Sequence, residues 1–253
     1  MGLELFGLCL YAYLAGAVPT PYLIARLVKG IDLRNYGSGN VGGSNVIRQL
    51  GKRWFVPLTA IEFLLKGLSP TLLAYLILAD DFPSGPRASF LFLCVPLLAL
   101  IGNNWSVFLR FQGGRGLMVV CGITLALVPV LFLVTITVYL IGWRVSRNSA
   151  VWALVAIVLL PILAWVPGGA MTLDWQGLWL LGRDGISSLP GRNESLVISV
   201  LGCAILGVVV LKRLVGNSLS FPEDVSTNRV ILNRLFKDRD VDDREKWVGR
   251  TPD

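Results

Sequence analysis

The sequence predicts an all-α, polytopic membrane protein with about seven transmembrane helices and a C-terminal tail in the cytoplasm. Three observations support this fold class. The 253 residues are 54% hydrophobic and only 15% charged, with a mean hydropathy of +0.67, whereas a soluble domain carries about 25% charged residues. The apolar residues are gathered in long runs, and the basic residues between these runs favour one side. Lipid is therefore the predicted solvent for most of the chain.

Six apolar runs are candidate membrane segments, because a helix needs about 20 residues to cross a bilayer. The first run lacks a basic beginning and a small-residue cleavage site, so it is predicted to be a retained helix rather than a signal peptide. The fourth run contains Pro129 and can be interpreted as one helix or as two short helices hinged there. The runs cover approximately residues 3–28, 54–79, 88–109, 117–143, 149–167 and 195–211.

The basic residues decide between six and seven crossings. With seven, ten Lys and Arg residues of segments 26–53, 110–115 and 144–147 share one side, and three lie in the opposite loops. Such an excess marks the cytoplasmic side. With six, Arg144 and Arg147 would change sides. We therefore predict seven crossings, an external N-terminus, and a hairpin in which at least one half is too short to span alone and tilts or packs against its neighbours.

Two glycine-rich segments fall on the predicted cytoplasmic side. The first is "NYGSGNVGGSN" (35–45), which Arg48 follows, and the second is "GNNWSVFLRFQGGRGLMVVCG" (102–122), which contains Arg115. Glycine amides can approach an anion closely, and arginine pairs with phosphate oxygens. Either segment alone is equally compatible with a tight turn at the membrane surface. Two of them on one face, each with an arginine, favour an anion-binding site.

Several other kinds of site are disfavoured. The first segment fits G-x-G-x-x-G at Gly37, Gly39 and Gly42, but a dinucleotide site needs a buried strand before this pattern, so the match is interpreted as coincidental. The chain has no histidine, the commonest general base and metal ligand. Its four cysteines lie in apolar runs without paired spacing, which disfavours a disulfide or zinc site. No basic patch interleaved with aromatic residues indicates nucleic-acid binding.

Glu62 and Lys66 lie four residues apart inside the second apolar run, on one face of a helix. Ionisable groups within a membrane span are costly, and they usually pair with each other or face the protein interior. An internal ion pair that packs two helices is the first interpretation. Direct contact with a ligand is the alternative.

Three stretches carry a family resemblance: "GAVPTPYLIARLVKGIDLRNYGSGNVGGSNVIRQLG" (16–51), "EFLLKGLSP" (62–70) and "NWSVFLRFQGGRG" (104–116), with a looser similarity through 144–164. Together they resemble the acyl-phosphate-dependent glycerol-3-phosphate acyltransferases of bacterial membranes. The resemblance implies a multi-pass protein of the bacterial inner membrane with its active site facing the cytoplasm. It would transfer an acyl group from acyl phosphate to glycerol 3-phosphate, giving lysophosphatidic acid and phosphate for phospholipid biosynthesis. Membrane lipids are the other expected partners, and no metal or other cofactor is expected.

The resemblance also implies roles for residues at matching motif positions. Ser38, Arg48 and Arg115 would be catalytic, with Ser38 and Arg48 on a substrate phosphate and the turn around Arg115 on the other phosphate. Asn40 and Asn45 would either shape the first segment or contact substrate. The other residues predicted to bind substrate are Gly37, Gly39, Gly42, Lys66, Asn103, Ser106, Gly113, Gly114 and Gly116.

The chain departs from the family pattern at three places. Asn103 stands where the family usually has His, and Arg115 stands where it usually has Lys. The third motif of the family, a His-Arg-Glu-Asn run before the basic end of the last helix, is replaced by the apolar "GVVV" (207–210). The alternative function is therefore a non-catalytic membrane protein that binds phosphate or lipid phosphate and retains the fold.

The predicted organisation is a transmembrane domain, residues 1–216, followed by a cytoplasmic tail, residues 217–253. The tail contains "NRVILNRLFKDRDVDDREKW", which has the pattern of a short amphipathic helix. We expect this helix to pack against the cytoplasmic face of the protein, with recruitment of another protein as the alternative. Its expected apolar side comprises Val230, Ile231, Leu235 and Trp247.

Overall fold

The structure is a computed structural model that describes residues 2–78, 86–165, 191–216 and 226–243, together with Glu245, Trp247 and Gly249. Over these residues the chain is helical and contains no β-strand, so the all-α fold class is confirmed. The predicted outer loops, around residue 80 and through most of 168–194, lie outside the described residues.

The helices follow one another through short connections. Three short helical turns and one π-helical segment, labelled η, interrupt the α-helices. In chain order the elements are α1 (Gly2–Ala17), α2 (Thr20–Lys29), η1 (Leu33–Asn35), α3 (Gly43–Leu50), η2 (Lys52–Trp54), α4 (Phe55–Ala60), the π-helical η3 (Ile61–Leu68), α5 (Ser69–Leu78), α6 (Pro86–Asn104), η4 (Val107–Leu109), α7 (Leu117–Leu127), α8 (Pro129–Ser146), α9 (Ser149–Trp165), α10 (Gly191–Val215) and α11 (Thr227–Lys237).

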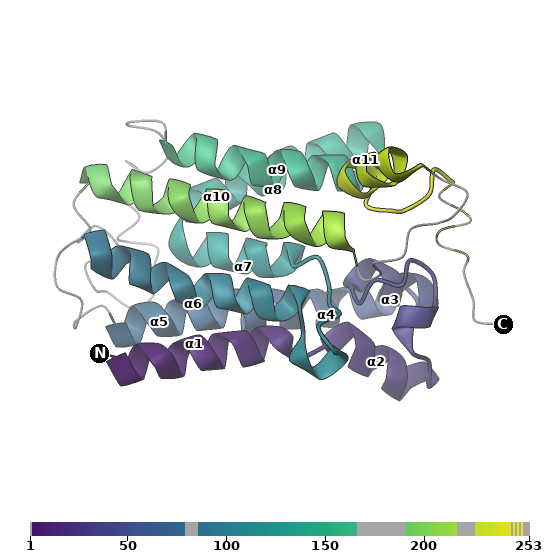
Figure 1. Cartoon of the computed structure of the whole chain (residues 1–253), viewed down its shortest axis with the longest axis horizontal. Helices are drawn as coiled ribbons and strands as arrows, with labels where there is room; N and C mark the ends of the chain where they lie inside the picture. Colours follow the sequence, from purple (N-terminus) through teal and green to yellow (C-terminus); the bar gives the residue numbers. More distant parts are fainter. Residues whose placement is uncertain are drawn as a thin grey trace.

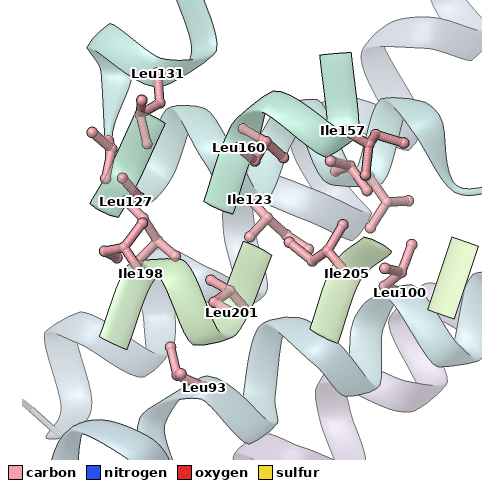
Figure 2. Close-up of a cluster of buried hydrophobic side chains, with 14 of the residues drawn as sticks. Leu93, Leu100, Ile123, Leu127, Leu131, Ile157, Leu160, Ile198, Leu201 and Ile205 are labelled. Carbon is pink, nitrogen blue, oxygen red and sulfur yellow. The ribbon is translucent and has the colours of Figure 1, made fainter. Parts of the chain in front are cut away.

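The long helices run side by side, and α2, α3 and α11 gather at one end of the molecule, on the right in Figure 1. α1 packs against α6, α9 packs against both α8 and α10, and α7 packs against η3. The largest apolar cluster lies where α6 to α10 converge (Figure 2), and Leu100, Ile123 and Ile205 are among its buried members. Since lipid tails are as apolar as these side chains, close packing holds such helices together within a membrane.

Glycines let two pairs of helices approach to backbone contact. A Cβ atom on Gly67 of η3 would lie 2.4 Å from the carbonyl oxygen of Val119, and one on Gly122 of α7 would lie 2.3 Å from that of Phe63. α1 approaches α6 in the same way at Gly16. This small-residue packing is typical of membrane helices, and it fixes η3, which carries the predicted ion pair, against α7.

The fourth apolar run forms two helices rather than one. α7 ends at Leu127 and α8 begins at Pro129, so the break falls at Val128, as the hinge interpretation predicts. Proline suits the first turn of a helix, because it lacks the N–H that has no partner there. The two helices return to the same end of the molecule, since Gly114 before α7 and Arg147 after α8 line one cavity.

Within the described residues, four helical stretches are long and apolar enough to cross a membrane, and three further apolar helices are shorter. α7 has 11 residues and is largely buried among its neighbours, as expected for the short half of the hairpin. The count of seven crossings remains a prediction. The four long stretches are Gly2–Lys29, Lys52–Ile77, Pro129–Ser146 and Leu196–Val215, and the shorter helices are Leu91–Asn104, Leu117–Leu127 and Ser149–Trp165.

The tail forms the expected helix, α11, but presents a different face to the protein. Val230 is buried as predicted, whereas the prediction for Ile231 was wrong, because this side chain is 39% exposed. The rest of the buried face is polar and consists of Asn233 and Arg234. Arg234 donates to the carbonyl oxygens of the last residues of α10, so hydrogen bonding rather than apolar burial selects the docked face. Trp247 lies beyond α11.

The topology can be tested by the accessibility of single cysteines. In a variant without the four native cysteines, all of which are free, Ser146→Cys at the end of α8 should react with a membrane-impermeant thiol reagent only from the cytoplasmic side. Leu3→Cys, near the opposite end of the molecule, should react only from outside. Reaction of residue 146 from outside would contradict the seven-crossing topology.

Candidate active site

The two glycine-rich segments meet in one cavity of about 480 Å³. The cavity lies at the end of the molecule where α3 and α11 are found (Figure 1). Residues far apart in the sequence therefore share one wall, as the sequence predicts for an anion site. The predicted site residues that line it are Ser38, Asn40, Gly42, Asn45, Arg48, Gly114, Arg115 and Gly116.

The backbones of the two segments touch. A Cβ atom on Gly114 would lie 2.9 Å from the carbonyl oxygen of Val41, so glycine is needed for this approach. Arg34 also joins them, because its guanidinium donates to both carboxylate oxygens of Asp32 at 2.9 and 2.6 Å and to Gln112 Oε1 at 3.4 Å. The hydrogen bonds between Arg34 and Asp32 lower the pKa of Asp32 and raise that of Arg34. The sequence had not singled out this connection.

Asn45 shapes the first segment from inside. Its side-chain amide is buried and donates to the carbonyl oxygens of Leu33, Tyr36 and Asn40, at 3.2, 2.8 and 3.2 Å. Gly39 has a φ of 69°, in the left-handed region that glycine adopts without strain. Of the two roles expected for Asn45, the structure shows loop shaping. The loop holds Ser38 at the cavity, with the backbone N–H of Asn40 donating to the Ser38 hydroxyl at 3.4 Å.

A buried polar layer lies behind the cavity wall. The Lys66 ammonium group pairs with the Glu62 carboxylate and donates to Asn103 Oδ1 at 3.1 Å, so the predicted internal ion pair is present. Glu62 also lines the cavity, and both charged residues lie in the π-helical η3, a form of helix that is frequent at functional sites. Six predicted site residues do not line the cavity itself: Gly37, Gly39, Lys66, Asn103, Ser106 and Gly113.

Arg115 is held by two contacts from other parts of the chain. Its Nε lies 2.8 Å from Oδ1 of Asp238, an ionic contact whose angles are not those of a hydrogen bond. One of its terminal nitrogens donates to the carbonyl oxygen of Lys212 at 2.7 Å. The arginine of the second segment is therefore already beside a carboxylate from the tail.

Most of the cationic side chains around the cavity come from parts of the chain that the sequence had not connected with the site. Six cations and two carboxylates line it among the described residues. Both carboxylates, those of Glu62 and Asp238, already contact a cation. The surplus of positive charge suits phosphate groups. The six cations are Arg48, Arg115, Arg147, Arg213, Lys237 and Arg239.

An apolar groove adjoins the charged cavity. It has a volume of about 60 Å³ and lies between α7, α8 and α9. Leu117, Met118 and Tyr139 line both spaces, so the polar cavity and the apolar groove are neighbours that share these side chains. The sequence had given no signal for the groove, because its lining residues are ordinary members of three apolar runs.

The chain is similar to known proteins whose names indicate a function for this site. A family model described as glycerol-3-phosphate acyltransferase matches residues 6–216. Glycerol-3-phosphate acyltransferase 5 of Dehalococcoides mccartyi is 31% identical over 252 residues, which cover 99% of this chain and 95% of the relative. A relative from Desulforudis audaxviator, named glycerol-3-phosphate acyltransferase, is 39% identical over 158 residues, covering 62% of this chain and 74% of the relative.

Solved structures are similar over nearly the whole chain. The crystal structure of PlsY (YgiH), an integral membrane glycerol 3-phosphate acyltransferase, in its glycerol 3-phosphate form superposes with a TM-score of 0.67 and 25% identity, covering 92% of this chain and 95% of that one. The lysophosphatidic acid form of the same protein gives a TM-score of 0.65 at 24% identity with the same coverage. The fold described above is therefore that of a known integral membrane enzyme.

The buried layer behind the cavity makes a prediction about stability. Lys66→Met should lower the free energy of unfolding by about 3–5 kcal/mol, because it leaves the Glu62 carboxylate buried without its partner. The double variant Glu62→Gln/Lys66→Met should recover more than half of this loss, since no uncompensated charge remains. Thermal unfolding in detergent micelles measures both. A single variant no less stable than the double one would contradict the ion pair.

Proposed function

The chain belongs to the glycerol-3-phosphate acyltransferase family, and we propose that it transfers an acyl group from acyl phosphate to glycerol 3-phosphate. The products would be lysophosphatidic acid, a precursor of phospholipids, and inorganic phosphate. The observation that carries the proposal is the convergence of both glycine-rich segments on one cavity with a surplus of cations. Its volume of about 480 Å³ lies in the range of small-molecule sites, about 300–1,000 Å³.

The two substrates need the features that this cavity combines. Each carries a phosphate, and the cavity lining offers two places to bind phosphate, Ser38 with Arg48 in the first segment and the turn around Arg115 in the second. Acyl phosphate also carries a long apolar chain. The groove between α7, α8 and α9, entered past Met118 and Tyr139, is the proposed path for that chain. Its apolar walls would accept lipid without leaving polar groups unpaired.

Acyl phosphate is already activated, so the protein needs to supply position and charge rather than a nucleophile. The hydroxyl oxygen of glycerol 3-phosphate attacks the carbonyl carbon, the bond from this carbon to the phosphate oxygen breaks, and phosphate leaves. The hydroxyl proton passes to a substrate phosphate, whose second pKa is about 6. Glu62 is a weaker candidate for this role, because Lys66 already holds its carboxylate.

The proposed location is the inner membrane of a bacterium, with the cavity open to the cytoplasm. The end of the molecule that bears the cavity also collects the basic segments that mark the cytoplasmic side. Both substrates are charged at their phosphate ends and would reach the cavity from water, while the acyl chain stays in the bilayer.

The function is tested by release of inorganic phosphate from acyl phosphate, with and without glycerol 3-phosphate, using purified protein in detergent. We expect release that depends on glycerol 3-phosphate and is matched by lysophosphatidic acid formation. Binding of phosphate compounds without turnover would instead favour the non-catalytic alternative, consistent with the apolar residues at 207–210.

Arg48 gives a direct test of the first segment. Its side chain is exposed in the cavity wall, so Arg48→Ala should leave the fold intact. A hydrogen bond to a charged group contributes about 1.5–3 kcal/mol, so the KM for glycerol 3-phosphate should rise about tenfold to a hundredfold. Arg53→Ala, which removes an exposed arginine outside the cavity, is the matched control and should change little. An unchanged KM for Arg48→Ala would make the glycine-rich segment a turn only.

The proton acceptor can be identified from pH dependence. If a substrate phosphate takes the proton, turnover should rise as pH passes its second pKa, about 6, and then level off. Glu62→Gln should then lower the rate by less than about tenfold, a typical loss on removing a general base being larger. A loss of a hundredfold or more in folded Glu62→Gln protein would make Glu62 the base.

A further inference from the structure

Part of the cavity wall comes from the tail, beyond the residues that match the family model. That match ends at residue 216, whereas Lys237, Asp238, Arg239 and Trp247 line the cavity. The Dehalococcoides mccartyi relative aligns over 99% of this chain, so the alignment reaches into the tail. A tail that lines the site can contribute to binding.

The tail is fixed to the helical body by two buried arginines. Arg234, which is 2% exposed, donates to the carbonyl oxygens of Leu214 and Val215 at 2.8 and 3.3 Å, and its Nε contacts Asp240 at 2.7 Å. Arg213, also 2% exposed, donates to the carbonyl oxygen of Leu235 at 2.7 Å and to that of Ala150 at 2.9 Å. These contacts bracket the segment 237–239 and hold it at the cavity.

The charges around this segment are not balanced. Asp238 lies against Arg115, and Lys237 donates to Asp242. The Nε atoms of Arg213 and Arg239 are buried, and neither has a hydrogen-bond partner among the described residues. Both side chains line the cavity. Because these Nε atoms are closed to solvent, an anion in the cavity would meet Arg239 at the terminal nitrogens of its guanidinium group.

We propose that Arg239 binds a substrate phosphate in the cavity, so that the tail supplies a contact in the absence of the third family motif. The matching turn of α10, residues 207–210, contributes no side chain to the cavity lining. Arg115 already has a carboxylate beside it, whereas Arg239 contacts no carboxylate among the described residues and brings its positive charge to the cavity. This inference rests on the proposed function for the identity of the phosphate compound, but the binding of phosphate itself can be tested separately.

The test compares Arg239→Ala with Arg229→Ala in the full-length protein. Arg229 is on the same tail, is mostly exposed and pairs with Asp242 outside the cavity. Arg239→Ala should raise the KM for glycerol 3-phosphate or for acyl phosphate about tenfold to a hundredfold, with a small change in kcat, and Arg239→Lys should restore part of the loss. Arg229→Ala should change neither constant by more than about twofold.

Direct binding separates this proposal from the proposed function. Calorimetric titration with glycerol 3-phosphate and with inorganic phosphate should show weaker binding to the Arg239→Ala protein even if no turnover is found in the unaltered protein. Should Arg239→Ala fail to fold, Arg239→Gln keeps most of the side-chain stem and serves in its place. Unchanged KM values and unchanged binding of both phosphate compounds, in a folded variant, would overturn the role of Arg239.

Discussion

Lipid offers no hydrogen bonds, so every backbone N–H and C=O group of this protein within the bilayer needs a partner inside the chain. Helices meet this condition along their length, but their ends and the glycine-rich segments do not. Most of the irregular backbone among the described residues lies at one end of the bundle. There Asn45 donates to the carbonyl oxygens of Leu33, just before the first segment, and of Tyr36 and Asn40 within it. A backbone hydrogen bond from Gly114 to Asn103 joins the second segment to the end of α6.

Arginine side chains donate hydrogen bonds to backbone carbonyl oxygens at the ends of the helices. Arg115 and Arg234 both donate to carbonyl oxygens in the last turn of α10, where cations are also favoured by the helix dipole. Arg213 reaches from α10 to the carbonyl of Ala150 near the start of α9. Arg115 and Arg213 also line the cavity, so two of the arginines that donate to these backbone carbonyls also give the cavity positive charge.

The fold was largely predictable because lipid imposes long apolar runs and an asymmetric distribution of basic residues. The hinge at Pro129 and the pairing of Glu62 with Lys66 followed from local spacing. Local spacing could not predict which site residues line the cavity and which lie in the buried layer behind it. Asn103 and Ser106 belong to the same short stretch as Arg115, and only the packing of the helices places them in the buried layer and Arg115 in the cavity wall. The tail was the hardest part: its docked face includes the polar Asn233 and Arg234, and apolar periodicity cannot identify a face held by hydrogen bonds.

The chemistry of arginine limits which roles of the missing third motif the tail could take over. A guanidinium stays protonated, so it can hold a phosphate but cannot accept a proton. Arg239 can therefore replace the binding role of a lost polar motif, but not the proton-accepting role of a lost imidazole. The chain has no histidine, and the two carboxylates that line the cavity among the described residues, Glu62 and Asp238, each lie against a cation, so we infer that a substrate phosphate is the proton acceptor. A site built from arginines and glycine amides favours the ionised form of that phosphate, and this is the form that takes the proton.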